Sequence, residues 1–120
     1  RTAMQTRTLP REAWESYFSE LFRKFFRDPN PEDATVELVS RELGDQVVTD
    51  VARVIGITYD PKDNVLDVAL EGLDHLIYRP KEIAVEERDD GFPEVISVVR
   101  DDGSRELIRL RSVGIEPKGS

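Results

Sequence analysis

The sequence predicts an α+β domain in which one N-terminal amphipathic helix packs on a mostly antiparallel, meander-like curled sheet of about seven short strands. Three observations lead to this prediction. Large apolar residues recur at helical spacing near the N-terminus, apolar and polar residues alternate from about residue 34 onward, and two Asp-Gly turns lie among the last strands. The helix is expected to lie across one face of the sheet or to fill one end of it.

The length and composition fit one soluble domain. The chain has 120 residues, of which 38% are hydrophobic and 35% are charged, with a net charge of −8. This length allows a hydrophobic core without disulfides. We expect a single domain over residues 4–113, with 1–3 and 114–120 as cloning remnants or flexible tails.

A helix is predicted from Pro10 to about Asp28. A proline in the first helical turn, followed by the acidic Glu12, is a usual start signal. Six large side chains then recur at i, i+3, i+4, i+7, i+8 and i+11: Trp14, Tyr17, Phe18, Leu21, Phe22 and Phe25. We expect this stripe to be buried against the sheet. Two prolines within 28–33 end the helix.

Short strands are predicted through the rest of the chain, at 34–40, 46–54, 55–60, 65–71, 75–79, 82–88, 93–100 and 105–111. The clearest hairpin joins 55–60 to 65–71, because each segment places its apolar residues on one face and a Pro-Lys-Asp-Asn turn separates them. Gly72 and Asp74 are expected to form the next turn, and Pro80 to separate the two strands that follow.

The composition excludes several kinds of chemistry. No cysteine is present, which excludes a disulfide scaffold, a thiol nucleophile and a cysteine zinc site, and a single histidine excludes any site with two imidazoles. The acidic turn at 60–67 lacks the residue order of an EF-hand calcium loop, so we expect neither metal nor cofactor. The net charge argues against nucleic acid and anionic membranes as partners. No apolar run is long enough to span a membrane, and we expect a cytoplasmic protein.

His75 and Asp74 are the candidate catalytic residues. A histidine beside a carboxylate is the arrangement of a general base with its orienting group. However, consecutive side chains of a strand point to opposite faces, so Asp74 would not orient His75. We therefore interpret His75 as a residue at the start of a strand, and we retain it as the first residue to mutate.

Three arginines form a candidate binding patch. Arg105, Arg109 and Arg111 fall on one face of the last strand by the period-two rule, and Arg100 ends the preceding strand. Such a patch would bind a small anion or an acidic peptide. The alternative is a solvated face whose arginines pair across strands with glutamates such as Glu86, Glu94 or Glu106.

The order and spacing of several short motifs also resemble a known family. They are Leu9-Pro10-Arg11 with Trp14 and Phe18, Leu43-Gly44-Asp45-Gln46, Ile57-Thr58-Tyr59-Asp60, Leu70 to Ile77 with Pro80 and Ile83, and Leu107-Ile108-Arg109 after an Asp-Gly hairpin. From about Met4 to Arg111 the chain resembles a small bacterial family of domains of unknown function. The resemblance implies a bacterial, intracellular, stand-alone domain and supplies no activity, cofactor or catalytic residue.

The function expected from these observations is that of a small cytoplasmic, non-enzymatic binding or interaction module. Its partner would be another protein or a second copy, through an exposed strand edge. The alternative is a small carboxylate-based hydrolase or sugar-active enzyme with His75 assisting, and a third interpretation is a barrel with a ligand pocket beneath the helix. A pocket that brings Asp74, His75 or Tyr78 to other carboxylates would favour the enzyme, and a flat face or free edge would favour the module.

Overall fold

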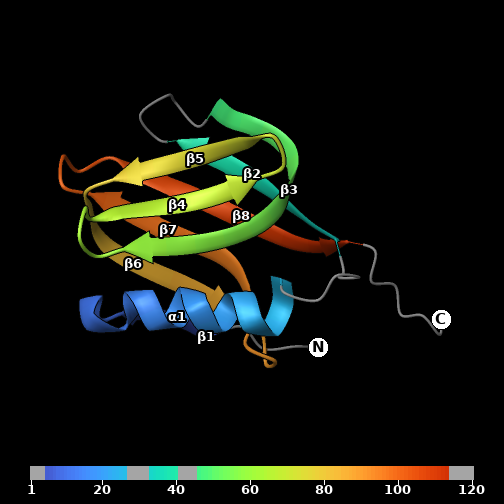
Figure 1. The fold of residues 1–120 in the computed structure, drawn as a ribbon, viewed down its shortest axis with the longest axis horizontal. Helices are drawn as coiled ribbons and strands as arrows, with labels where there is room; N and C mark the ends of the chain where they lie inside the picture. The colour runs from blue at the N-terminus through green and yellow to red at the C-terminus, as the bar shows by residue number, and fades with distance from the viewer. Residues whose placement is uncertain (1–4, 27–32, 41–45, 114–120) are drawn as a thin grey trace.

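The structure is a computed structural model that describes residues 5–26, 33–40 and 46–113, with only the backbone described for 26, 33–40, 46–53, 73 and 111–113 (Figure 1). Its strands form one antiparallel sheet of eight strands, in the order β1-β6-β7-β8-β2-β3-β4-β5. Their bounds are β1 Gln5–Leu9, β2 Asp33–Ser40, β3 Gln46–Asp60, β4 Val65–Leu70, β5 Leu73–Tyr78, β6 Pro80–Glu87, β7 Pro93–Arg100 and β8 Arg105–Val113.

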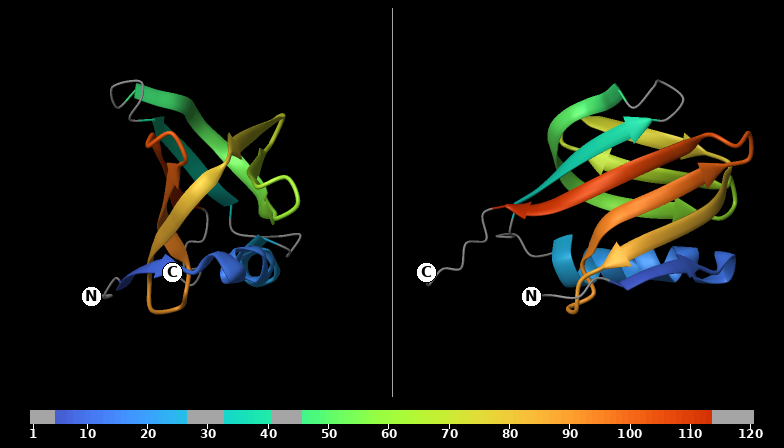
Figure 2. Two further views of the ribbon diagram at one scale, coloured as in Figure 1. Left: turned by 90° about the vertical axis from the view of Figure 1, so that its left-hand side faces the viewer. Right: turned by 180° about the vertical axis from the view of Figure 1, so that it is seen from behind.

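The long strand β3 folds the sheet into two layers. Its first half pairs with β2 as far as Arg53, and its second half pairs with β4 from Val54 onward. Between Val54 and Gly56 the register shifts, which leaves Ile55 as the extra residue of a β-bulge. In Figure 2 the sheet curls so that β3, β4 and β5 form a second layer over β6, β7, β8 and β2. The two strands predicted at 46–54 and 55–60 are therefore one continuous strand, β3, with a bulge.

The helix covers the side of β3 that has no partner strand. A 3-10 turn, η1 (Arg11–Ala13), leads into α1 (Trp14–Leu21), and a π-helical turn, η2 (Phe22–Phe26), follows. Contacts from α1 and η2 reach β3, whose second half is paired with β4 only on its other side (Figure 1). The helix begins where the Pro10 signal predicts, and the expected α+β class is confirmed.

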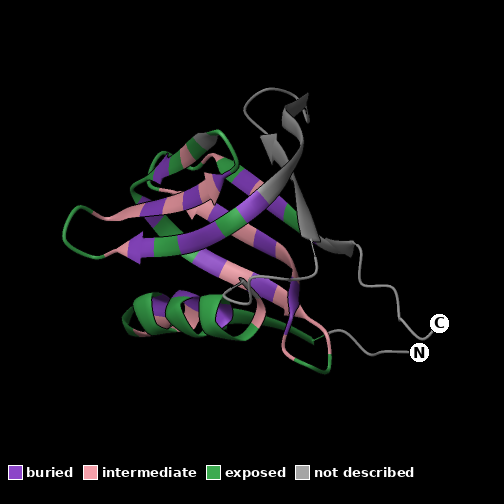
Figure 3. Ribbon diagram, turned by 45° about the vertical axis from the view of Figure 1, so that its right-hand side comes forward, coloured by how far each residue is buried: buried purple, intermediate pink, exposed green. Residues whose placement is uncertain are grey.

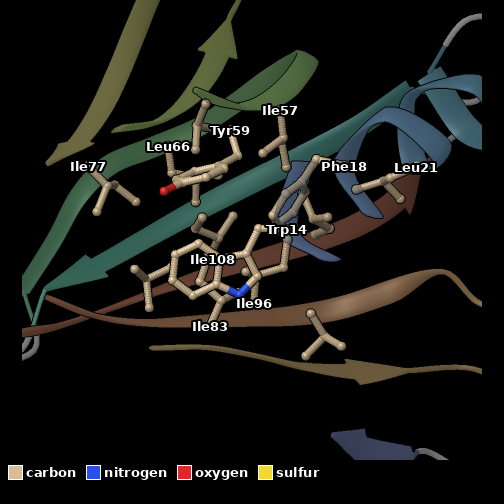
Figure 4. Packing of buried hydrophobic residues seen from close by; sticks show 14 of the residues in the cluster. Trp14, Phe18, Leu21, Ile57, Tyr59, Leu66, Ile77, Ile83, Ile96 and Ile108 are labelled. Carbon is tan, nitrogen blue, oxygen red and sulfur yellow. The ribbon is translucent and has the colours of Figure 1, made fainter. Parts of the chain in front are cut away.

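The core lies between the helix and the two layers, and it is filled by side chains from both (Figure 4). Trp14 is 1% exposed, donates its indole N–H to the carbonyl oxygen of Leu9 over 3.0 Å, and meets Tyr59 edge to face with ring centroids 5.1 Å apart. The inward side chains of the strands are buried and the outward ones are not, as Figure 3 shows. Beneath the helix, Trp14 and Phe18 pack among buried side chains of the strands, such as Ile96 (Figure 4).

One residue of the predicted helical stripe is not buried. Trp14, Phe18 and Leu21 are buried, and Tyr17 and Phe25 are partly buried against the core. Phe22, in contrast, is 41% exposed and lies against Gly56, where a Cβ would come within 3.5 Å of the Phe22 ring. The stripe of six residues is broader than the part of the helix surface that packs against the core, so Phe22 at its margin lies on the surface.

A polar cluster holds the helix to the two strands at the other edge of the sheet. The Tyr17 hydroxyl donates to Glu87 over 2.6 Å, and the Arg7 guanidinium donates to the same carboxylate over 3.0 Å. Burial would raise the pKa of Glu87, but the hydrogen bonds from Arg7 and Tyr17 outweigh it and lower that pKa. Burial and the bond to Glu87 raise the pKa of Tyr17. These contacts join α1 to β1 and β6.

The strands differ from the prediction in two places: one predicted turn is wrong and one strand was not predicted. Asp74 does not lie in a turn, because Leu70 pairs with Leu73, so the turn is Glu71-Gly72 and Asp74 pairs with Ala69 inside β5. A two-residue hairpin turn needs positive φ, and Gly72 supplies it at +85°. Strand β1 was not predicted, because it is polar and only its last residue, Leu9, is buried. Its pairing with β6, rather than an apolar pattern, makes it a strand.

Candidate functional site

His75 faces the space between the two layers and contacts a carboxylate from the other layer. Its Nε2 atom lies 2.8 Å from Oε1 of Glu106 on β8, and the two side chains are only 20% and 11% exposed. The second oxygen of Glu106 lies 3.8 Å from the Arg100 guanidinium at the end of β7. His75, Glu106 and Arg100 therefore form a polar cluster that links β5 to the β7–β8 hairpin.

The carboxylate next to His75 in sequence has no part in this cluster. Asp74 is exposed and lies on the opposite side of β5, as the alternation of a strand requires. Sequence reasoning named Glu106 as a possible partner of the arginines, as its contact with Arg100 confirms, but missed its pairing with His75, which is 31 residues away. The available signal was its position: Glu106 occupies an inward position of β8, on the same side as Ile108 and Leu110, where a charged residue needs a partner.

A different surface gathers the exposed apolar side chains. We call it the outer face: the side of the second layer turned away from the core, made of Gly56, Thr58, Asp60, Val65, Asp67, Ala69, Asp74, Leu76 and Tyr78. In Figure 1 this layer lies in front. Among the residues whose side chains are described, four large apolar ones are more than a third exposed: Phe22 41%, Ile55 52%, Leu76 39% and Tyr78 45%. All four belong to this face or to the helix and bulge beside it.

The outer face contains an open hollow of about 680 Å³. Its apolar lining comes from Pro61, Val65, Leu76 and Tyr78, and its carboxylates are Glu15, Asp60, Asp63 and Asp67. His75 does not line it. The hollow thus brings Tyr78 to several carboxylates, and it combines an apolar floor with negative charge.

Asp67 is the least satisfied carboxylate of this face. Its Oδ1 atom is buried and has no hydrogen-bond partner among the described residues. Burial, and then the neighbouring carboxylate of Asp74, raise the pKa of Asp67 above the ordinary aspartate value. A cation placed over Asp67 would therefore relieve its like-charge contact with Asp74.

We expect Asp67→Asn to stabilise the isolated protein near neutral pH by about 0.5–1 kcal/mol. A raised pKa in the folded state contributes stability that is fully present below the pKa of the unfolded chain and is lost as the pH rises through the folded pKa. The charged carboxylate is thus unfavourable at neutral pH, and the gain from asparagine should shrink towards about pH 4. Urea unfolding at both pH values measures this difference. Asp63→Asn, in the exposed turn, is the control and should give no gain.

The two edges of the sheet differ in chemistry. β1 exposes Gln5, Thr6, Arg7 and Thr8, which are polar or charged in the manner of a protected edge. β5 instead exposes Leu76 and Tyr78. The carbonyl oxygen of Tyr78 accepts a hydrogen bond from Nε of Arg100 over 3.1 Å, so this carbonyl points away from β4. By the alternation of an antiparallel ladder, the backbone groups of Leu76 and Asp74 point the same way.

The predicted arginine patch lies on the far side of the molecule. Arg105 and Arg109 are exposed on β8, with the half-buried Leu107 between them, and line a hollow of about 330 Å³. Arg105 donates to the Ser97 hydroxyl over 3.1 Å. Arg100 is not part of this patch because it points inward to Glu106, and the Arg111 side chain lies outside the described residues. Binding of an anion here stays a prediction.

The described residues contain no cluster of three histidine or carboxylate side chains arranged to hold a metal ion. Within the same part of the chain, no helix has the length and apolar character needed to cross a membrane.

The fold and the outer face define a small α+β domain: a helix against a curled antiparallel sheet, with an acidic and apolar face beside one free edge. The chain belongs to the family described as "Family of unknown function (DUF5335)", whose model matches residues 5–118. It is 42% identical over 109 residues to an uncharacterised protein of Aquifex aeolicus, covering 90% of this chain and 94% of the relative. No solved structure matches it.

Proposed function

We propose that this domain is a non-enzymatic interaction module that binds a partner protein through the outer face and the β5 edge. The observation that carries the proposal is the gathering of Leu76 and Tyr78 on β5, whose far side has no partner strand among the described residues. Exposed apolar side chains on a sheet edge favour association, and soluble proteins usually protect such edges. The contrast with the polar β1 edge supports a role for β5 beyond folding.

The alternative of a carboxylate enzyme is favoured by one observation, since the hollow brings Tyr78 to several carboxylates, but His75 takes no part in it. His75 and the carboxylates of the hollow lie on opposite sides of β5, so they do not converge on one substrate position. The His75 side chain is largely occupied by Glu106. The hollow is open, whereas a small-substrate site encloses most of the ligand surface, so the hollow suits a protein surface better.

A partner other than a second copy fits the charge of the face. Two outer faces brought together would oppose the carboxylates of Asp60, Asp67 and Asp74 to the same residues of the other copy, in a chain of net charge −8. Like charges across an interface disfavour it. We therefore propose heterologous binding.

Site-specific crosslinking tests this proposal. A photoreactive phenylalanine analogue replaces Leu76 or Tyr78 in separate variants, expressed in the source organism or a close relative, and a third variant carries it at Thr8 on the β1 edge. We expect the same discrete adduct from both β5 positions and none from Thr8. Equal labelling at all three positions, or no adduct at either β5 position in folded protein, would contradict the proposed function.

A further inference from the structure

The chemistry of the outer face points to one kind of partner segment, and this inference rests on the proposed function. We propose that the outer face and the β5 edge bind an extended basic segment that adds to β5 as a further strand, with basic and apolar side chains alternating along the strand face that continues the outer face. Main-chain groups of Asp74 and Leu76 would pair with the segment, and its cations would lie over Asp67 and Asp74. This mode of recognition is β-strand addition.

The position of Asp67 suits a cation carried by an added strand. On the outer face Thr58, Asp67 and Leu76 form one cross-strand row, and Asp74 is diagonal to Asp67 on β5. A strand beside β5 would place every second side chain on this face, about 5 Å from Leu76 or Asp74. A long lysine or arginine side chain from that position reaches past β5 to Asp67, whose Oδ1 atom is buried without a partner among the described residues.

The apolar side chains of the proposed segment would pack beside the hollow of the outer face. Leu76 and Tyr78 flank the hollow of about 680 Å³, together with Val65 and Pro61. A valine or leucine side chain on the outer face of the added strand would cover the exposed parts of Leu76 and Tyr78. Alternation of basic and apolar residues along one strand face therefore matches the alternation of carboxylates and apolar side chains on the domain.

Charge complementarity distinguishes this occupant from others. An acidic segment would add charge beside Asp67 and Asp74, which already raise each other's electrostatic free energy. A second copy would add no cation to Asp67, since the β5 residues that face outward are Asp74, Leu76 and Tyr78. A basic segment alone brings a counter-charge to the carboxylates of Asp67 and Asp74 and covers the apolar side chains at once.

The test is an NMR titration of the isotope-labelled full chain with acetyl-Lys-Thr-Val-Thr-Lys-Thr-Val-Thr-Lys-amide, in which lysine and valine alternate along one strand face. Two matched peptides accompany it, one with glutamate in place of lysine and one with both valines N-methylated, and the titration with the lysine peptide is repeated at raised salt. We expect the lysine peptide to shift amide signals of Asp74, Leu76, Thr58 and Asp67, and to slow hydrogen exchange at Leu76. The acidic and N-methylated peptides should not bind, and salt should weaken binding.

The matched comparison is the double substitution Asp67→Asn with Asp74→Asn against Glu82→Gln with Asp89→Asn, two exposed residues that do not line the hollow. Each pair removes two negative charges, but only the first removes them from the proposed cation site. We expect the first pair to lower the affinity for the lysine peptide by about tenfold and the second pair to change that affinity by no more than about twofold. Equal weakening by both pairs would assign the binding to overall charge and overturn the inference.

The remaining outcomes separate this inference from the proposed function. Crosslinks at Leu76 and Tyr78 together with no binding of the lysine peptide would keep the module and overturn the basic segment. Binding of the N-methylated peptide as tightly as the parent would overturn strand addition. A dimer in native mass spectrometry of the protein alone, lost in Leu76→Lys, would assign the face to a second copy and overturn both proposals.

Discussion

Trp14→Ala is expected to lower the free energy of unfolding by about 3–5 kcal/mol. The indole is 1% exposed, contacts Tyr59 edge to face, and donates to the carbonyl oxygen of Leu9, so alanine leaves a cavity and an unpaired carbonyl where the helix meets β3. Urea unfolding followed by circular dichroism measures the change, because the variant lacks the only tryptophan of the chain.

The control for this prediction is another aromatic residue of the same helical segment. Phe22 is 41% exposed and contributes less buried area, so Phe22→Ala should lower the free energy of unfolding by about 1 kcal/mol or less. The two substitutions thus separate burial from aromatic content. Equal effects, or an unchanged melting temperature for Trp14→Ala, would contradict the packing of the helix on β3.

Glu106→Ala is expected to lower the free energy of unfolding by about 2–3 kcal/mol. Oε1 of Glu106 lies 2.8 Å from Nε2 of His75, and Oε2 lies 3.8 Å from the Arg100 guanidinium, and all three side chains are at most 20% exposed. Alanine leaves His75 without its carboxylate and Arg100 without a counter-charge in a partly buried place. Urea unfolding followed by Trp14 fluorescence measures the effect near neutral pH.

Two matched variants test the cause of this loss. Glu106→Gln retains an acceptor for His75 and should lose less stability than the alanine variant. Glu82→Ala removes an exposed carboxylate from β6 and should change the free energy of unfolding by less than about 0.5 kcal/mol. A loss for Glu82→Ala as large as that for Glu106→Ala would assign the effect to net charge and not to the His75 cluster.

The stability gain expected for Asp67→Asn and the proposed binding of a partner's cation at Asp67 have the same physical cause. A carboxylate whose charge is unfavourable in the isolated domain becomes favourable when a partner brings a cation to it. If both predictions hold, the substitution that stabilises the free protein also weakens the bound state. Such opposition between stability and binding is common where a surface is built for a partner.

Some of the fold could be predicted because the physical cause is local. The spacing from Trp14 to Phe25 requires a helix if one face is to be buried, and the alternation along 105–111 correctly separates the outward Arg105 and Arg109 from the inward Ile108 and Leu110. Strand β1 could not be predicted, because its residues bury almost nothing and its hydrogen bonds depend on β6.

The candidate site depended on contacts between distant parts of the chain. The hollow joins Glu15 of the helix to the β3–β4 turn and to Leu76 and Tyr78 of β5, and no local pattern relates these residues. In the same way, the sequence singles out His75 as a residue to mutate, but its partner Glu106 comes from another layer. The expected turn at Asp74 was wrong because Gly72 alone supplies the positive φ that the hairpin needs.

The sequence by itself therefore determined the class of the fold, the helix and its buried stripe, the period of the strands, and the absence of cysteine and of paired histidines. These follow from composition and from the two periods that hydrogen bonding imposes on the backbone. Only the tertiary structure decided that Glu106 pairs with His75, that the carboxylates of Asp67 and Asp74 meet, and that Leu76 and Tyr78 lie on a free edge. These follow from strand order and from the fold of β3, which no local interaction sets.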